Sequence, residues 1–229
     1  MRQLPLGVQL GVSLRFGTFH EAGNRELVAL LAGPATPGAI WIYGPPGAGK
    51  SHLLQAACAA AGDAGRTAAY LPLAAVRPEG PGLLAGFERL GLVALDDADS
   101  VTGDGAWELA LFALYNGVLE QGGRLLLAAR SAPGSLPVRL PDLASRLAAA
   151  SVHRLAPLPE GDQAEALRRR AAHRGLELPD ETLHYLARHA PRDFAALCTL
   201  LDALDTEALA AQRRLTVPFV REVLERRAR

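Results

Sequence analysis

The chain has 229 residues, with 24 Lys and Arg residues against 24 Asp and Glu residues, and 49% of its residues are hydrophobic. This composition excludes a disordered chain, which combines low hydrophobicity with high net charge. It also excludes a protein that holds nucleic acid through an overall positive field. The N-terminus lacks the apolar run of a signal peptide, and no stretch is apolar for long enough to cross a membrane. We therefore expect a cytoplasmic protein that makes no membrane contact.

Predicted strands and helices alternate along the first two thirds of the chain. Residues 1–20 resemble an extended arm, and residues 24–32 a short helix with Asn24 at its N-cap. The segments that follow are predicted, in chain order, as strand 39–43, helix 50–61, strand 67–73, strand 90–97, helix 105–121, strand 124–129, helix 140–149 and strand 152–158. This alternation predicts an α/β fold, a parallel five-stranded sheet with helices on both faces.

The pattern changes near Pro157 and Pro159. Beyond them only helices are expected, over residues 160–174, 180–189, 192–205 and 216–228. The predicted organisation is therefore an arm over residues 1–20, an α/β domain over 21–157 and a small all-α domain over 158–229.

Residues 44–51 read GPPGAGKS and match the Walker A pattern G-x-x-x-x-G-K-[ST] between a predicted strand and a predicted helix. The glycines let backbone N–H groups approach phosphate oxygens. The positive end of the following helix also attracts these oxygens. Lys50, the only lysine of the chain, would contact the β- and γ-phosphates, and Ser51 would bind Mg²⁺. The residues predicted to bind ADP or ATP here are Gly44, Pro45, Pro46, Gly47, Ala48, Gly49, Lys50, Ser51 and His52. The alternative is a glycine turn that binds nothing.

The run LVALDD at residues 92–97 supplies a matching Walker B motif, an apolar strand that ends in carboxylates. Asp96 is the predicted Mg²⁺ ligand, directly or through water. Asp97 is the candidate for polarising the attacking water. The alternative is a solvated strand end, which is also our interpretation of Asp99.

The order of these motifs resembles the AAA+ P-loop NTPase superfamily. The closer resemblance is to the DnaA-related proteins, and closest to the Hda family of regulatory inactivators of DnaA. The stretches that carry it are QLPL at 3–6, SHLLQAACA at 51–59, WELALFALYN at 107–116, LPDLASRL at 140–147 and RRLTVPFVREVL at 213–224. The resemblance implies that the α/β domain is an AAA+ module and that the helical domain is its lid.

The resemblance also assigns roles to particular arginines. Arg146, in ASRL, corresponds to the arginine finger, which one subunit projects onto the γ-phosphate held by another. Arg192 corresponds to the sensor 2 arginine, which contacts the chain's own nucleotide. For sensor 1 the candidates are Arg130 and Ser131. The alternative for Arg146 is a surface arginine with a local ion pair. The alternative for Arg192 is an ion pair with Asp193.

The QLPL segment resembles the short motif with which replication proteins dock on the β sliding clamp. Gln3 would hydrogen-bond at the rim of the clamp pocket, while Leu4 and Leu6 would fill apolar subsites. The alternative is an arm that packs its leucines on its own domain.

Together these features imply a regulator that binds adenine nucleotide, docks on DNA-loaded clamp and offers Arg146 to the ATP on DnaA, which inactivates the initiator and prevents re-initiation. The chain ends at Arg229, where DnaA continues into a DNA-binding domain, so DNA would be reached mainly through the clamp. A homodimer is a candidate assembly. Two other functions stay open: a self-sufficient ATPase or helicase loader that acts as a homo-oligomer, and a nucleotide-dependent scaffold on the clamp.

Overall fold

The computed structural model describes residues 14–34, 36–189 and 194–227. The chain divides into two compact units, Met1–Pro157 and Leu158–Arg229. Each unit has its own hydrophobic core.

The first unit is built on a parallel five-stranded sheet, which confirms the predicted fold class. Its strands are β1 (Gly38–Tyr43), β2 (Ala68–Pro72), β3 (Leu92–Asp96), β4 (Arg124–Ala129) and β5 (Ser151–Arg154). They lie in the order β2-β3-β4-β1-β5. In the register of the sheet Tyr43 pairs with Ala129, and Pro72 pairs with Asp96. The carboxyl ends of these strands therefore meet at one edge, where ligands bind in open α/β sheets.

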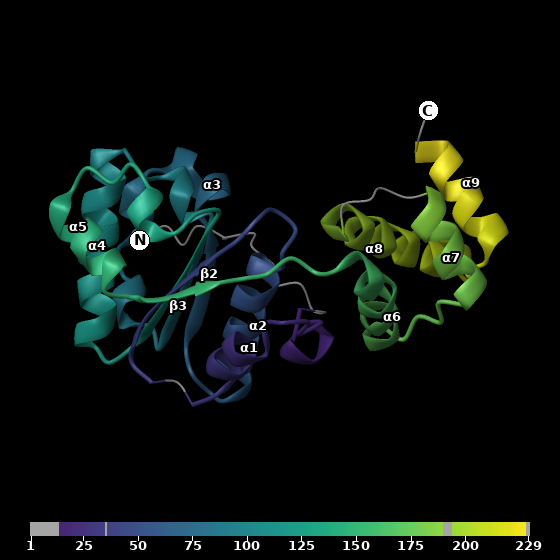
Figure 1. Cartoon of the computed structure of the whole chain (residues 1–229), viewed down its shortest axis with the longest axis horizontal. Helices are drawn as coiled ribbons and strands as arrows, with labels where there is room; N and C mark the ends of the chain where they lie inside the picture. The colour runs from purple at the N-terminus through teal and green to yellow at the C-terminus, as the bar shows by residue number, and fades with distance from the viewer. Residues whose placement is uncertain (1–13, 35, 190–193, 228–229) are drawn as a thin grey trace. The chain divides into compact units, whose positions relative to one another are not determined.

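Helices cover both faces of this sheet (Figure 1). The helices of the unit are α1 (Arg25–Ala32), α2 (Lys50–Asp63), α3 (Leu73–Val76), α4 (Gly105–Glu120) and α5 (Pro141–Ala148). Trp41 and Ile42 are successive residues of β1, so their side chains point to opposite faces. Trp41 joins the core under α4 and α5, whereas Ile42 joins the core under α1 and α2. Both side chains are fully buried, so neither face of β1 is exposed to solvent.

The fifth strand is shorter than the sequence suggests, because it ends at Arg154 rather than near residue 158. The N–H of Leu155 still donates to the carbonyl of Tyr43, at 2.7 Å. The next residue, Ala156, is held by Asn24 instead of by the sheet. The Asn24 side chain accepts from the Ala156 N–H at 2.9 Å and donates to its carbonyl at 3.1 Å. Asn24 stands at the N-cap position of α1 as predicted, but its side chain makes no capping bond there.

The second unit is a bundle of helices, and its described residues include no strand. Its helices are α6 (Gln163–His173), α7 (Asp180–His189), α8 (Phe194–Ala211) and α9 (Val217–Arg227). Helix α8 continues six residues past its predicted end at 205. Leu204 and Ala208 are both buried and lie on one face of the helix, so its apolar stripe extends beyond residue 205. The buried hydroxyl of Thr182 donates to the carbonyl of Leu215, at 2.9 Å, and so ties α7 to the start of α9. None of the helices in the described ranges is long and apolar enough to span a membrane.

Candidate functional site

The loop between β1 and α2 has a backbone that requires the glycines of its motif. At Gly44 a Cβ atom would lie 2.5 Å from the carbonyl oxygen of Leu155. Gly47 and Gly49 have φ angles of 77° and 98°, in the left-handed region that other residues rarely adopt. A Cβ at Gly49 would also lie 2.7 Å from the Phe19 ring. This sequence therefore forms a tight turn that places the N-terminus of α2 at the carboxyl edge of the sheet.

Lys50 begins α2, and its ammonium group lies inside the loop. Its Nζ donates to the carbonyls of Gly44 at 2.7 Å and Pro45 at 3.0 Å, and the residue is only 8% exposed. Burial lowers the pKa of Lys50, and the carboxylates of Asp96 and Asp97 oppose this shift. A buried cation beside a helix N-terminus forms a cradle that suits the phosphates of a nucleotide. Pro45 and Pro46 are exposed on its outer side, and Ala48 is buried beneath it.

Two acidic residues end the neighbouring strand β3. Asp96 is 2% exposed, and its Oδ1 accepts the N–H of Asp97 at 3.0 Å. Asp97 has a φ of 51°, which is uncommon for any residue except glycine. Burial raises the pKa of Asp97, and so do the charges of Asp96 and Asp99. Such strained, partly buried carboxylates are typical of functional sites.

The oxygen donors at this edge suit Mg²⁺. Ser51 offers an exposed hydroxyl in the first turn of α2, and Asp96 offers a carboxylate. Among the described residues there is no group of three or more His, Cys, Asp or Glu side chains that could enclose a metal ion. This is compatible with Mg²⁺, which binds through one or two protein oxygens and takes its other ligands from phosphate and water.

The two sensor 1 candidates lie after β4 at the same edge. The Arg130 guanidinium is exposed and lies 3.9 Å from the Asp99 carboxylate. Its positive charge adds to the lowering of the Lys50 pKa, and it opposes the rise of the Asp97 pKa that burial causes. Ser131 uses its carbonyl to accept the indole N–H of Trp41, at 3.0 Å. Arg130 is therefore the candidate whose charge reaches the site.

His52 contacts the segment that precedes α1. Its Nε2 lies 2.9 Å from the carbonyl oxygen of Arg15 and 3.2 Å from the Thr18 hydroxyl, and its ring meets the edge of Phe19. Within the predicted arm, residues 16–18 form a 3₁₀ turn and Phe19 is buried. This part of the arm thus packs on the first turn of α2.

Arg146 lies in the last turn of α5, on its solvent side. The neighbouring Leu143 and Leu147 are buried and fix the helix against α4, so the exposed Arg146 side chain points outward. It forms no ion pair with any residue in the described part of the chain. The local ion pair that was the alternative for Arg146 is thus absent among the described residues.

The match to a known protein family lies in the second, helical unit. Residues 160–224 match the family described as Hda, lid domain. Domain III of the replication initiation protein DnaA from Thermotoga maritima has a similar structure, with a TM-score of 0.73 at 19% identity over 95% of this chain and 98% of that one. The second unit therefore matches an Hda lid domain, and the chain shares the fold of DnaA domain III.

Two further structures share the fold of this chain. The AMPPCP-bound DnaA of Aquifex aeolicus matches with a TM-score of 0.65 and 22% identity, over 86% of this chain and 66% of that one. The RuvB Holliday junction branch migration motor of T. maritima matches with a TM-score of 0.58 and 17% identity, over 90% and 69% of the two chains. The predicted AAA+ fold is confirmed.

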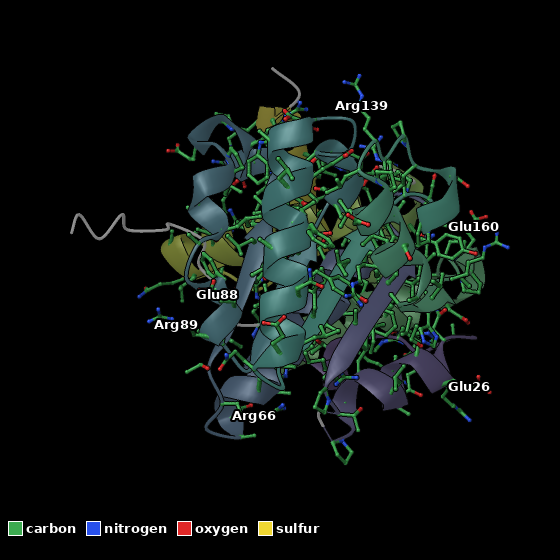
Figure 2. The ribbon with its side chains drawn as sticks, turned by 90° about the vertical axis from the view of Figure 1, so that its left-hand side faces the viewer. Glu26, Arg66, Glu88, Arg89, Arg139 and Glu160 are labelled. Atoms are coloured by element: carbon green, nitrogen blue, oxygen red, sulfur yellow. The ribbon has the colours of Figure 1, made fainter. Side chains whose placement is uncertain are left out.

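One buried carboxylate of the first unit was not predicted from the sequence. Glu108 on α4 has no solvent exposure. It accepts the N–H groups of Gly103 at 2.7 Å, Arg139 at 3.0 Å and Leu140 at 2.8 Å. The side chain of Arg139 points into solvent, as Figure 2 shows, so only its backbone serves this contact. Glu108 thereby fixes the entrance of α5, the helix that carries Arg146.

We expect Glu108→Gln to destabilise the protein by about 3 kcal/mol, or roughly 6–12 °C in melting temperature, because an amide cannot accept all three N–H groups. Burial raises the pKa of Glu108, but the N–H groups of Arg139, Gly103 and Leu140 outweigh it and hold that pKa below its ordinary value. A lowered pKa stabilises the fold above the unfolded pKa of about 4.3, and this contribution is lost as the pH falls through the folded pKa.

The measurement is thermal unfolding of both proteins between pH 3 and pH 7. The difference between wild type and variant should be largest near neutral pH and should shrink in acid. A difference that is independent of pH would show that the charge of Glu108 has no part in its stabilising contacts.

Four predicted residues lie outside the described parts of the chain: Gln3, Leu4, Leu6 and Arg192. Their roles in clamp binding and in sensing nucleotide rest on the sequence alone.

Proposed function

We propose that this protein is a regulator of replication initiation that stimulates hydrolysis of the ATP bound to DnaA. In this proposal the chain docks on the β sliding clamp through Gln3, Leu4 and Leu6, and it contributes Arg146 to the nucleotide site of DnaA. The observation that carries the proposal is an exposed Arg146 without an ion pair among the described residues, in a chain with an Hda lid.

We infer that the chain also binds ADP or ATP at the loop of residues 44–51. The glycine backbone and Lys50 would hold the phosphates, while Ser51 and Asp96 would hold Mg²⁺. Arg192 would contact the same nucleotide. The AMPPCP-bound DnaA of A. aeolicus, which shares this fold, supports an adenine nucleotide as the ligand. Bound Mg²⁺ would neutralise charge on the phosphate oxygens.

The position of Arg146 suits a contribution in trans. An arginine finger stabilises charge on a phosphoryl group held by another protein, so its guanidinium has to reach beyond its own chain. The buried face of α5 and the contacts of Glu108 hold the helix, while the side chain itself extends into solvent. Asp97 would serve the chain's own turnover, which we expect to be slow.

The decisive experiment follows hydrolysis of labelled ATP already bound to purified DnaA, with DNA-loaded clamp, with and without this protein. We expect acceleration only when both the clamp and this protein are present. Rapid turnover by this protein alone, without an effect on DnaA, would instead support the self-sufficient ATPase or helicase loader. The intact loop and the pair Asp96 and Asp97 are the features that support this second function.

The clamp motif yields a separate prediction. The double substitution Leu4→Ala, Leu6→Ala should weaken clamp binding about a hundredfold or more, because two leucine side chains would no longer be buried in the clamp. Surface plasmon resonance on immobilised clamp measures the effect, with Val8→Ala, just outside the motif, as the matched control. Nucleotide affinity should not change. A double variant that binds clamp as tightly as wild type would refute the clamp assignment.

A further inference from the structure

Tyr70 on β2 contacts Asp96, one of the residues that are expected to hold Mg²⁺. Its hydroxyl donates to Oδ2 of Asp96 at 2.8 Å. The ring is partly buried against the core under α2. A phenol group on β2 therefore binds the carboxylate at the end of β3.

The chemistry of these two groups fixes the direction of the hydrogen bond. An ionised carboxylate only accepts, so the single proton of Tyr70 goes to Asp96. Burial raises the pKa of Tyr70, and the Asp96 charge raises it further, so the phenol keeps its proton at neutral pH.

This arrangement prepares the Asp96 carboxylate for a cation. The carboxylate is held on both sides, by the Tyr70 hydroxyl on Oδ2 and by the Asp97 N–H on Oδ1. It would keep both of these hydrogen-bond partners when a cation arrives.

We propose that Tyr70 is a positioning residue for Mg²⁺, which acts by orienting the carboxylate of Asp96. The inference rests on the proposed nucleotide site. It assigns to Tyr70 a function beyond packing in the core, because a phenylalanine would fill the same space without making this contact.

The test is Tyr70→Phe, measured by fluorescence titration with an N-methylanthraniloyl derivative of ADP, in EDTA and at increasing MgCl₂. We expect affinity in EDTA to stay within about twofold of wild type, since the phosphate cradle is intact. The MgCl₂ concentration for half of the maximal affinity gain should rise about tenfold, the effect of losing one hydrogen bond to a charged group. Tyr115→Phe, which removes a buried hydroxyl from α4, is the matched control and should behave as wild type.

The other outcomes are distinct. An unchanged Mg²⁺ dependence in Tyr70→Phe would overturn the inference, as would an equal loss of affinity with and without Mg²⁺, which indicates a purely structural role. Wild-type protein that binds nucleotide with no gain from Mg²⁺ would overturn it while leaving the nucleotide site in place. Wild-type protein that binds no nucleotide would overturn the proposed site itself.

If Tyr70→Phe does not fold, a crystal structure of wild-type protein with ADP and Mg²⁺ replaces it. The Tyr70 oxygen should then stay within hydrogen-bonding distance of Asp96. A Tyr70 side chain turned away from Asp96 would overturn the inference.

Discussion

Replacing Arg146 with alanine should lower the clamp-dependent rate of hydrolysis of DnaA-bound ATP about a thousandfold, the lower end of the range for arginine fingers. The guanidinium would stabilise charge that develops on the transferring phosphoryl group, and alanine supplies nothing in its place. The assay is the labelled-ATP experiment above. Arg146→Lys should fail almost as badly, because an ammonium group cannot form the paired hydrogen bonds of a planar guanidinium.

Arg139→Ala is the matched control for this experiment. Arg139 is an exposed arginine just before α5, and only its backbone N–H is used, by Glu108. Its removal should leave the stimulated rate within about twofold of wild type, as is usual for an isolated surface charge. Stimulation that survives in Arg146→Ala would exclude the finger and would favour the nucleotide-dependent scaffold on the clamp.

Lys50→Ala should reduce nucleotide affinity at least about a hundredfold, because two or more charge-assisted hydrogen bonds to phosphate would be lost. Lys50→Arg should give a similar loss although it keeps the charge. The loop leaves Lys50 only 8% exposed, and the larger planar guanidinium does not fit the same space. Both variants should be measured by nucleotide titration and by nucleotide content after purification.

The circular dichroism spectra of these variants should match that of wild type, because the sheet and its helices do not depend on the ammonium group. A Lys50→Ala protein that retains its nucleotide would contradict the phosphate cradle. A Lys50→Arg protein that binds nucleotide as tightly as wild type would show that charge alone, without the compact shape of lysine, is sufficient.

The sequence predicts most of the fold because its elements are encoded locally. The strand at 39–43, the glycine loop and the helix from Lys50 follow from apolar runs and from one motif, and the structure has all three. The same holds for α4, whose Trp107, Leu111 and Leu114 recur at helical spacing and are buried. Element ends were less predictable, as at β5, where Asn24 replaces the sheet as the partner of Ala156.

Contacts between distant parts of the chain could not be predicted in this way. Glu108 meets Leu140 across 32 positions, and Tyr70 meets Asp96 across 26. A glutamate within an apolar helix and a tyrosine within a strand carry no local sign of such partners. Only the packing of α5 against α4, and of β2 beside β3, brings these groups together. The roles of Gln3, Leu4, Leu6 and Arg192 stay predictions.

The two carbonyl contacts of Lys50 bear on how a ligand would enter the loop. In the arrangement described, the ammonium is already solvated by the oxygens of Gly44 and Pro45. A buried cation with no such partners would carry a penalty of several kcal/mol. Nucleotide binding at the proposed site would then exchange one set of acceptors around the ammonium for another.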